Sequence, residues 1–375
     1  MAREDAGGLP GALSRDRVVI LPSASSLSRV DACIASEVIP IRVHTTGNAA
    51  ERGNEIHAFI DDVAMGKGRS AALEAVPLEW RSTCEGIDVD AIVGGLSGLR
   101  TEVAYAIDME IEAVRVLGHH MGRKYPHTLA TEVRGTLDIT GIRADCIPCV
   151  IDIKTGQDVG PAATNWQLRF FAFCLLCETG AEVVDGRLVY IREDGSHYAD
   201  CHAFTAEDLL RVPEDLRAIG SRLTKARAAF AATGALELYA GDHCKYCPAQ
   251  LNCPAKTSIV RSMAGELASV GGAFTEMTAE QLEKAWLSYE QIKPLFWAVD
   301  DGLKSVARTR GIDLSDGRTV RAVEVHKTYF SKEKALALLS ERGASAEEIA
   351  ACTRDSVENH VRTLKPKKRS SHVSK

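Results

Sequence analysis

The stretch that decides the fold is residues 150–156, VIDIKTG. Asp152 and Lys154 lie two residues apart in an otherwise apolar run, and the glycine after them predicts the end of a strand. Residues i and i+2 of a strand point to the same face, so the carboxylate and the ammonium are expected side by side. A buried strand of an α/β domain is normally apolar on both faces. The pair therefore indicates either an ion pair at a strand end or part of a functional site.

A second carboxylate precedes this pair. Asp138, in RGTLDITG, ends the preceding predicted strand, and a hairpin would place it beside Asp152 and Lys154. Two carboxylates brought together raise each other's pKa unless a cation lies between them. Mg²⁺ meets this need, because it prefers a few carboxylates together with water and substrate phosphate. The set indicates metal-assisted phosphodiester hydrolysis, in which Lys154 holds or helps to deprotonate the attacking water.

Three other side chains bear on this site. Asp145 would replace Asp138 as the first carboxylate in a different hairpin register, but the glycine in GTLD favours Asp138. His57, in RGNEIH on a predicted helix, is a candidate further metal ligand. Gln167, in NWQLRFF after the charged strand, could hold a phosphate or a base. Each has an ordinary structural interpretation alone, and together they favour a functional site over an isolated ion pair.

The order of these residues resembles the PD-(D/E)XK nuclease superfamily, in its RecB-like branch with a C-terminal cysteine cluster. The resemblance covers about residues 23–262 and is closest to the versions found in phage and mobile-element proteins. The motifs G-x-x-x-H, G-x-x-D, D-x-K-T-G and Q-L are here Gly53 to His57, Gly135 to Asp138, Asp152 to Gly156 and Gln167-Leu168. One motif departs from the pattern: Q-x-x-x-Y has Phe171 at the tyrosine position, so its hydroxyl is lost or supplied elsewhere.

The resemblance implies an α/β fold with a restriction-endonuclease-like core, a mixed central sheet flanked by helices. It implies that Asp138, Asp152 and His57 bind Mg²⁺ or Mn²⁺, that Lys154 is the catalytic lysine and that Gln167 joins the catalytic set. The implied activity is DNA hydrolysis by an exonuclease of recombination, repair or phage replication. The implied partners are DNA with free ends and a recombination or single-strand-annealing protein. A catalytically weak DNA-binding or end-holding module is the alternative, which the intact acids and lysine disfavour.

Residues 241–254, GDHCKYCPAQLNCP, bring Cys244, Cys247 and Cys253 close together in sequence. Short cysteine loops of this kind bring thiolates to one metal centre. A fourth ligand is missing locally, because His243 is adjacent to Cys244 and joint ligation would be awkward. The sequence therefore predicts a metal site that needs a distant ligand.

By resemblance, this distant ligand is Cys33, and the four cysteines hold a four-iron four-sulfur (4Fe–4S) cluster. Such a cluster would pin the two ends of the nuclease domain together and form a metal-cluster-stapled periphery. Zinc remains the alternative metal, in which case the protein could be a zinc-stabilised structural protein. Two other CxxC pairs, Cys146/Cys149 and Cys174/Cys177, are assigned to no metal, since neither has the context of a ligand or redox motif.

Composition bounds the environment of the protein. The chain has 375 residues, 45% of them hydrophobic and 26% charged, and a net charge of −6. No apolar run is long enough to span a membrane, and the first residues predict no signal peptide. Eleven cysteines without a signal peptide favour a reducing, cytoplasmic location. The negative net charge gives no support for a generally basic nucleic-acid surface but permits a local one.

Five segments are expected along the chain. Residues 1–22 are a flexible N-terminus and 23–262 the nuclease domain, followed by a glycine-containing linker at 263–274. A smaller, mostly helical accessory region with one short hairpin follows at 275–364, where His326 is a surface histidine. Residues 365–375 form a basic tail, interpreted as a solvated terminus.

Hydrophobic periodicity predicts the elements inside the nuclease domain. A helix is expected from near Ala49, and a long helix over 94–118, where apolar residues recur at helical spacing. The period then changes to that of strands over 129–141 and through the VIDIKTG stretch. The helix that contains NWQLRFF is expected to end at Gly180. A strand at GRLVYIRED and a helix over 205–232 complete the predicted core.

Overall fold

A computed structural model describes most of the chain. The described residues are 21–40, 48–122, 124–125, 129–156, 159–241, 243–244, 247–269, 277–315, 317–321, 341–343 and 345. The chain forms two compact units, Met1–Val299 and Asp300–Lys375. In the described part of the chain, no helix has both the length and the apolar character needed to cross a membrane.

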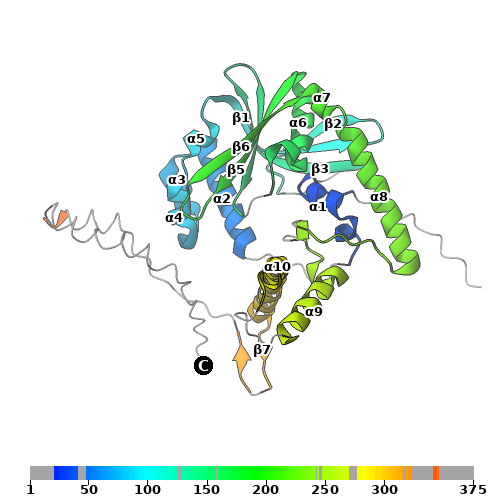
Figure 1. The fold of residues 1–375 in the computed structure, drawn as a ribbon. Helices are drawn as coiled ribbons and strands as arrows, with labels where there is room; N and C mark the ends of the chain where they lie inside the picture. The colour runs from blue at the N-terminus through cyan, green and yellow to red at the C-terminus, as the bar shows by residue number, and fades with distance from the viewer. Residues whose placement is uncertain are drawn as a thin grey trace, which may run out of the picture. The chain divides into compact units, whose positions relative to one another are not determined.

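The first unit is built on a six-stranded sheet with the strand order β2-β1-β3-β4-β5-β6 (Figure 1). Neighbouring strands are antiparallel except for β4 and β5, which are parallel and joined through the helix α6 (Trp166–Thr179). A parallel pair needs such a crossover, whereas antiparallel neighbours can be joined by short turns. The strands are β1 (Leu96–Asp108), β2 (Ala113–His119), β3 (Glu132–Arg143), β4 (Pro148–Lys154), β5 (Val183–Ile191) and β6 (His197–Thr205).

Helices cover both faces of this sheet. One core packs α6 with the short helices η1 (Ala24–Ser26) and α1 (Leu27–Ala32) and with α8 (Val212–Thr233). The opposite core packs α2 (Asn48–Ala64) and the helices that follow it. The predicted mixed sheet flanked by helices is therefore present. Further helices among the described residues of the unit are η2 (Ile34–Glu37), α3 (Arg69–Ala75), α4 (Leu78–Gly86), α5 (Val89–Val93), η3 (Ala162–Thr164), α7 (Ala206–Leu209), η5 (Gln250–Asn252), α9 (Pro254–Ser269) and the first part of α10 (Ala279–Thr309).

The predicted long helix over 94–118 is wrong, because this segment forms the hairpin of β1 and β2. Val103, Tyr105 and Ile107 alternate into one core, and the intervening alanines are also fully buried. A strand that is buried on both faces shows no polar alternation, so its apolar residues also matched a helical spacing. The β-branched and aromatic content of the segment, together with the turn at 109–112, was the signal for strands.

The other predicted elements of the core are present at shifted boundaries. The helix α2 begins at Asn48, and α6 ends at Gly180, whose φ of 68° provides the left-handed conformation of a C-cap. The strand β6 and the helices α3 to α5 had no counterpart in the sequence-based prediction. Strand β6 is an edge strand with few buried residues, so its sequence carries a weak hydrophobic pattern.

The predicted linker overlaps an ordered helix. Residues 263–269 form the last turns of α9, since no proline or turn dipeptide interrupts the helix before them, and 270–274 lie outside the described residues. The helix α10 runs from Ala279 to Thr309, and β7 (Ile312–Asp313) pairs with β8 (Thr319–Val320) as a short hairpin where one was predicted. The N-terminal segment up to residue 20, His326 and the basic tail also lie outside the described residues.

Candidate metal and catalytic site

The site lies where β3 and β4 separate. Their last ladder pair is Ile139 with Ile151, and one more step in the same register sets Asp138 opposite Asp152. The side chain of Asp138 takes over the hydrogen bonding there, because its Oδ2 accepts a bond of 2.7 Å from the backbone N–H of Ile153. The parting of these two strands brings both carboxylates together. Asp138 does not end its strand as predicted, because β3 continues to pair with β1 as far as Glu132.

Lys154 follows Asp152 on the same strand and points to the same place. Its Nζ lies 2.6 Å from Asp152 Oδ2 and donates a hydrogen bond of 2.9 Å to Gln167 Oε1 on α6. The side chain of Asp152 is 1% exposed, and its Oδ2 has the ion pair but no hydrogen bond of acceptable geometry. Burial raises the pKa of Asp152 and Asp138 adds to this, while Lys154 opposes it.

His57 reaches the same point from α2, on the other side of the sheet. Its Nδ1 lies 3.3 Å from Asp138 Oδ1. Burial works against protonation of His57, but the negative charge of Asp138 outweighs it and raises the pKa of the imidazole. Burial likewise disfavours the charged form of Asp138, yet His57 and the Ile153 N–H lower the pKa of this carboxyl overall. Asp138 is therefore ionised at neutral pH while Asp152 is harder to ionise.

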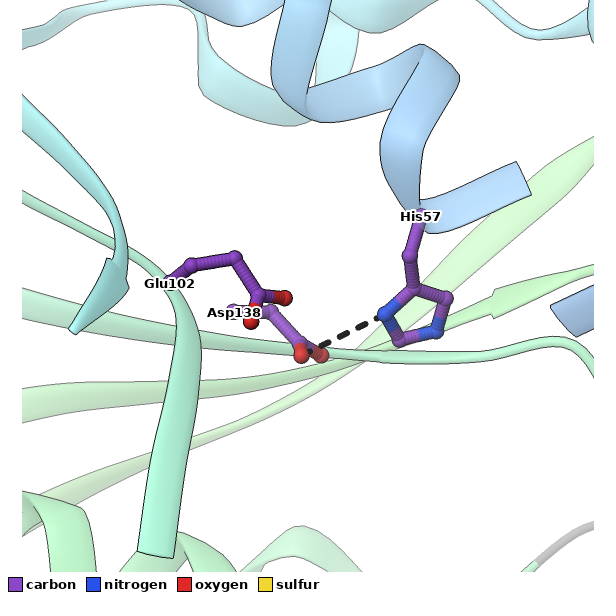
Figure 2. Close-up of side chains that lie close together, drawn as sticks. All are labelled: His57, Glu102 and Asp138. Atoms are coloured by element: carbon purple, nitrogen blue, oxygen red, sulfur yellow. Dashed lines mark ion pairs between the residues drawn. The ribbon is translucent and has the colours of Figure 1, made fainter. Parts of the chain in front are cut away.

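Glu102 is a member of the cluster that sequence reasoning missed. The pairs Thr101 with Ile139 and Val103 with Leu137 place it opposite Asp138 on the neighbouring strand β1. Ligand-type atoms of His57, Glu102 and Asp138 all lie within 4.8 Å of one another (Figure 2). The signal in the sequence was a single acid in an apolar segment. This acid indicates a site residue only when the segment is assigned as a strand.

The backbone of Glu102 explains how its side chain reaches the cluster. Its φ is 47°, in the left-handed region that non-glycine residues rarely occupy. Its carbonyl oxygen accepts a hydrogen bond of 3.0 Å from the N–H of His120 beyond β2. A residue held in this conformation inside a strand changes the direction of its side chain, as a β-bulge does.

The structure places the other candidates elsewhere. Asp145 lies in the turn between β3 and β4, where Arg143 donates to its carboxylate at 2.8 Å, so it does not join the cluster. Phe171 is fully buried in the core beneath Tyr105 and Phe170, which leaves its ring away from solvent. An aromatic ring without a hydroxyl fits such a position, since a buried hydroxyl would need a partner.

The polar side chains of the cluster line one cavity of about 670 Å³. Its lining includes His57, Glu102, Asp138, Asp152, Lys154 and Gln167, with further residues of η1, β3 and the loop after β4. The residues present fit a divalent metal ion on two grounds. Carboxylate and imidazole ligands converge within a few ångströms. In addition, burial and the neighbouring Asp138 raise the pKa of Asp152, and a cation between the two carboxylates would relieve both effects.

The cysteines predicted to bind a metal also meet. Cys33, Cys244, Cys247 and Cys253 line one small cavity, although more than 200 residues separate the first from the others. His243 lies beside them and hydrogen-bonds to the Cys244 thiol at 3.6 Å. Bonds to Cys244 and Cys33 raise the pKa of His243 to about 10. Burial favours the neutral thiol of Cys33 and Cys244, but His243 lowers the pKa of both.

The remaining cysteine pairs have no such surroundings. Cys146 is exposed in the turn before β4 and Cys149 is buried within it, where burial raises its pKa to about 12. Cys174 is buried in α6 and Cys177 is exposed at its end. A buried thiol with a raised pKa is inert, so Cys149 and Cys174 are part of the packing.

Comparison with protein families identifies one match. Residues 126–370 match DUF2800, described as a family of proteins of unknown function. The chain is a member of the DUF2800 family. The matched region contains β3, β4 and α6, and with them Asp138, Asp152, Lys154 and Gln167. A search of curated proteins found no relative of this DUF2800 protein.

Two solved structures are similar to this DUF2800 protein, both with a low TM-score. One is a candidate exonuclease from Eubacterium rectale, with 10% identity and a TM-score of 0.34, covering 59% of this chain and 88% of its own. The other is the protein SSO0001, with 16% identity and a TM-score of 0.26, covering 62% of this chain and 96% of its own. With scores this low, the function has to be argued from the residues of the site.

Proposed function

We propose that the protein is a metal-dependent DNA nuclease that hydrolyses phosphodiester bonds. The observation that supports this most directly is the meeting of Asp138, Asp152 and Lys154 in one open cavity. Ion pairing alone would not require a third and fourth ligand-type group, and His57 and Glu102 lie within reach of the same point. A cluster rich in carboxylates beside a lysine suits phosphoryl chemistry at a divalent cation.

The ligands we assign to Mg²⁺ or Mn²⁺ are Asp138, Asp152 and His57, with Glu102 as a further candidate. A metal ion bound there would polarise a phosphoryl oxygen and lower the pKa of an attacking water. Asp138 is suited to hold a cation because its pKa is lowered and it is ionised before any ion arrives. His57 must lose its proton to act as a ligand, so protons compete with the metal at this position.

Lys154 and Gln167 act on the other reacting groups. Lys154 Nζ is held between Asp152 Oδ2 and Gln167 Oε1, which fixes the ammonium group beside Asp152. From this position it can orient the attacking water and offset the negative charge that grows on the phosphate. Gln167 positions the lysine, and its amide nitrogen is a donor that can meet a phosphate oxygen.

We propose further that the four cysteines hold a 4Fe–4S cluster rather than zinc. Tetrahedral zinc with bonds of about 2.3 Å would draw its sulfurs to about 3.8 Å from one another. Among the described residues, which include all four cysteines, no three thiol sulfurs lie within 4.8 Å of one another. Thiolates of an iron–sulfur cluster bind different irons and lie farther apart, and the four cysteines that line one cavity could serve as its ligands.

The substrate ends, the cellular process and the partner protein are separate proposals. We infer an exonuclease that acts on DNA with free ends in recombination, repair or phage replication, alongside a recombination or single-strand-annealing protein. A reducing, cytoplasmic environment would suit the free thiols and the iron–sulfur cluster. The division into a nuclease domain at 23–262 and an accessory region at 275–364 remains a prediction.

The nuclease proposal is tested with purified protein and end-labelled linear DNA, single- and double-stranded. Degradation should require Mg²⁺ or Mn²⁺ and should fall by at least about a hundredfold in Lys154→Ala, because a positioned proton-transfer or charge-stabilising group contributes this much. Lys225→Ala, which removes an exposed lysine of α8, serves as the matched control. Blocking either end of the duplex distinguishes exonuclease from endonuclease action.

The same assay distinguishes the competing functions. Wild-type protein that leaves both kinds of DNA intact under both metals is not a nuclease. Tight DNA binding without cleavage would instead identify an end-holding module. For the cysteine site, an anaerobic preparation should be brown and contain iron, whereas a colourless protein with stoichiometric zinc would contradict the iron–sulfur proposal.

A further inference from the structure

A lysine side chain is buried beside the cysteine site. Lys256, on α9, lines the same cavity as Cys33, Cys244, Cys247 and Cys253. Only 2% of the lysine is exposed. A lysine is almost never fully buried without a partner, because an ammonium group that leaves water loses a large hydration energy. The buried charge of Lys256 therefore requires a negative charge nearby.

The described residues provide no carboxylate for this charge. Lys256 Nζ donates a hydrogen bond to the backbone carbonyl oxygen of Gln291 on α10, and it forms no ion pair with a described carboxylate. A carbonyl oxygen accepts the hydrogen bond but carries no net charge. Arg29 provides a contrast, because its charge also favours the thiolate of Cys247 but its guanidinium pairs with Glu37 at 2.5 Å.

The cysteines themselves can provide the negative charge. Burial favours the neutral thiol of Cys244, but the hydrogen bond with His243 lowers its pKa, and the positive charge of Lys256 acts in the same direction. The ammonium group is thus close enough to favour a thiolate. A metal bound by four cysteines makes this charge permanent, because zinc with four thiolates remains anionic and so does an iron–sulfur cluster with four thiolates.

We propose that Lys256 provides the buried positive charge that offsets the cysteine metal centre. The inference rests on the proposed binding of a metal by the four cysteines, and it holds for an iron–sulfur cluster and for zinc. Lys256 is not a ligand, since an ammonium group has no lone pair to donate. It is a positioning residue, whose hydrogen bond to Gln291 fixes the charge and whose charge stabilises the bound thiolates.

The first test measures how firmly the metal is held. Full-length protein is purified anaerobically with its metal, and the loss of metal to an excess of EDTA is followed over time by elemental analysis. Lys256→Met replaces the ammonium group by an apolar side chain of similar length and should release the metal about tenfold faster, as is typical when a residue that supports metal ligands is lost. Lys225→Met makes the same change at an exposed position of α8 and should release the metal at the wild-type rate.

The reduction potential of an iron–sulfur cluster separates the charge of Lys256 from its packing. Loss of a nearby positive charge disfavours the added electron, so the potential of Lys256→Met should be more negative than that of wild-type protein. Loosened packing would admit water instead, which stabilises the more highly charged reduced cluster and shifts the potential the other way. A potential that becomes more positive would therefore contradict the inference.

A double-mutant cycle makes the same distinction with either metal. In the otherwise wild-type protein, Lys256→Met should lower the midpoint of thermal unfolding by about 2–4 °C. In a Cys33→Ala protein, from which a proposed ligand is removed, the same change should leave the midpoint unchanged or raise it, because a buried charge without its counter-charge destabilises the fold. An equal decrease in both proteins would identify a packing role and overturn the inference. Circular dichroism establishes that each variant is folded.

The metal content of wild-type protein separates this inference from the proposal on which it rests. If wild-type protein contains a metal and Lys256→Met releases it at the wild-type rate, the inference is wrong and the cysteine metal centre stands. If wild-type protein purified anaerobically contains no metal, the metal centre and the inference fail together. The nuclease proposal is tested separately, by DNA cleavage and Lys154→Ala.

Discussion

At the scale of single residues, the backbone conformation of Glu102 determines where its carboxylate lies. A glutamate with φ of 47° inside a strand costs on the order of 1–3 kcal/mol relative to extended backbone. The surrounding pairs with β3 on both sides and the bond from His120 N–H hold it in this conformation. Such strain persists where the surrounding structure imposes it, and here it turns a carboxylate towards His57 and Asp138.

A substitution tests whether this carboxylate is a metal ligand. Glu102→Gln preserves the shape of the side chain but removes its charge, so Mg²⁺ affinity measured by calorimetry should fall by about tenfold or more. Glu110→Gln, an exposed acid in the turn of the same hairpin, is the matched control and should leave affinity unchanged. Equal metal affinity in Glu102→Gln and wild-type protein would remove Glu102 from the ligand set.

A second residue-scale prediction concerns acid stability. Glu132 accepts hydrogen bonds from Arg115 Nε at 2.6 Å and Nη2 at 2.9 Å, and from the Leu129 N–H at 2.7 Å. The hydrogen bonds from Arg115 lower the pKa of Glu132 below its ordinary 4.5, although burial opposes this. The folded carboxyl titrates below the unfolded one, so its stabilisation is present above about pH 4.5 and is lost as pH falls through the folded pKa.

Urea unfolding at several pH values checks this expectation. Glu132→Gln should lower the free energy of unfolding at pH 7 by about 1–2 kcal/mol, a value that allows for the solvent exposure of Arg115. The difference from wild-type protein should shrink towards pH 3. A difference that stays constant with pH would show that the titration of Glu132 does not contribute to acid unfolding.

At the scale of elements, the site depends on close packing beneath β3. Gly135 leaves room for η1 and α6, because a Cβ at this position would lie 2.6 Å from the Ala24 Cβ and 3.0 Å from the Phe171 ring. Both neighbours belong to the packed core, so they cannot move aside freely. The strand that carries Asp138 is thereby pressed against the helix that carries Gln167.

Gly135→Ala should therefore destabilise the protein by about 1–3 kcal/mol through overpacking, measured as a lower urea midpoint. Gly265→Ala is the informative comparison, because its Cβ meets nothing within 4 Å and alanine is the better helix former in α9. We expect this second change to raise stability by up to about 1 kcal/mol. A neutral Gly135→Ala would mean that η1 can shift away from the strand.

At the scale of the whole molecule, the cysteine site connects segments that are distant in sequence. Cys33 follows α1, and Cys244 to Cys253 follow α8, so a metal centre there would join the segment after α1 to the segment after α8. Restricting a loop of this length stabilises a fold mainly by reducing the freedom of the unfolded chain.

Cys33→Ala should abolish iron incorporation and lower the midpoint of thermal unfolding by about 10 °C, since a lost structural metal typically costs several kcal/mol. Cys177→Ala, at an exposed cysteine at the end of α6, is the control and should retain both iron and stability. Iron content by elemental analysis and thermal unfolding under anaerobic conditions provide the two measurements. A Cys33→Ala protein with full iron content would exclude Cys33 as a ligand.

The elements that could be predicted from the sequence are those specified by short-range signals. The charged pair in VIDIKTG, the strand before it and the helix after it could be assigned because strand periodicity, a terminal glycine and a C-cap are short-range signals. A compact α/β domain followed from their order, and the sheet flanked by helices was implied by the family resemblance. Where a strand is buried on both faces, as in β1, the local pattern is ambiguous and the prediction of a helix was wrong.

Which side chains lie close together depends on strand pairing and could not be predicted from local patterns. The register of β3 against β4 separates Asp138 from Asp145, and the positive φ of Glu102 brings a third acid to the cluster. Tyr125 reaches Arg134 from a connection whose path no periodicity encodes. The physical reason is that hydrophobic patterning specifies which face of an element is buried. Strand pairing and bulges specify which polar groups lie across from one another.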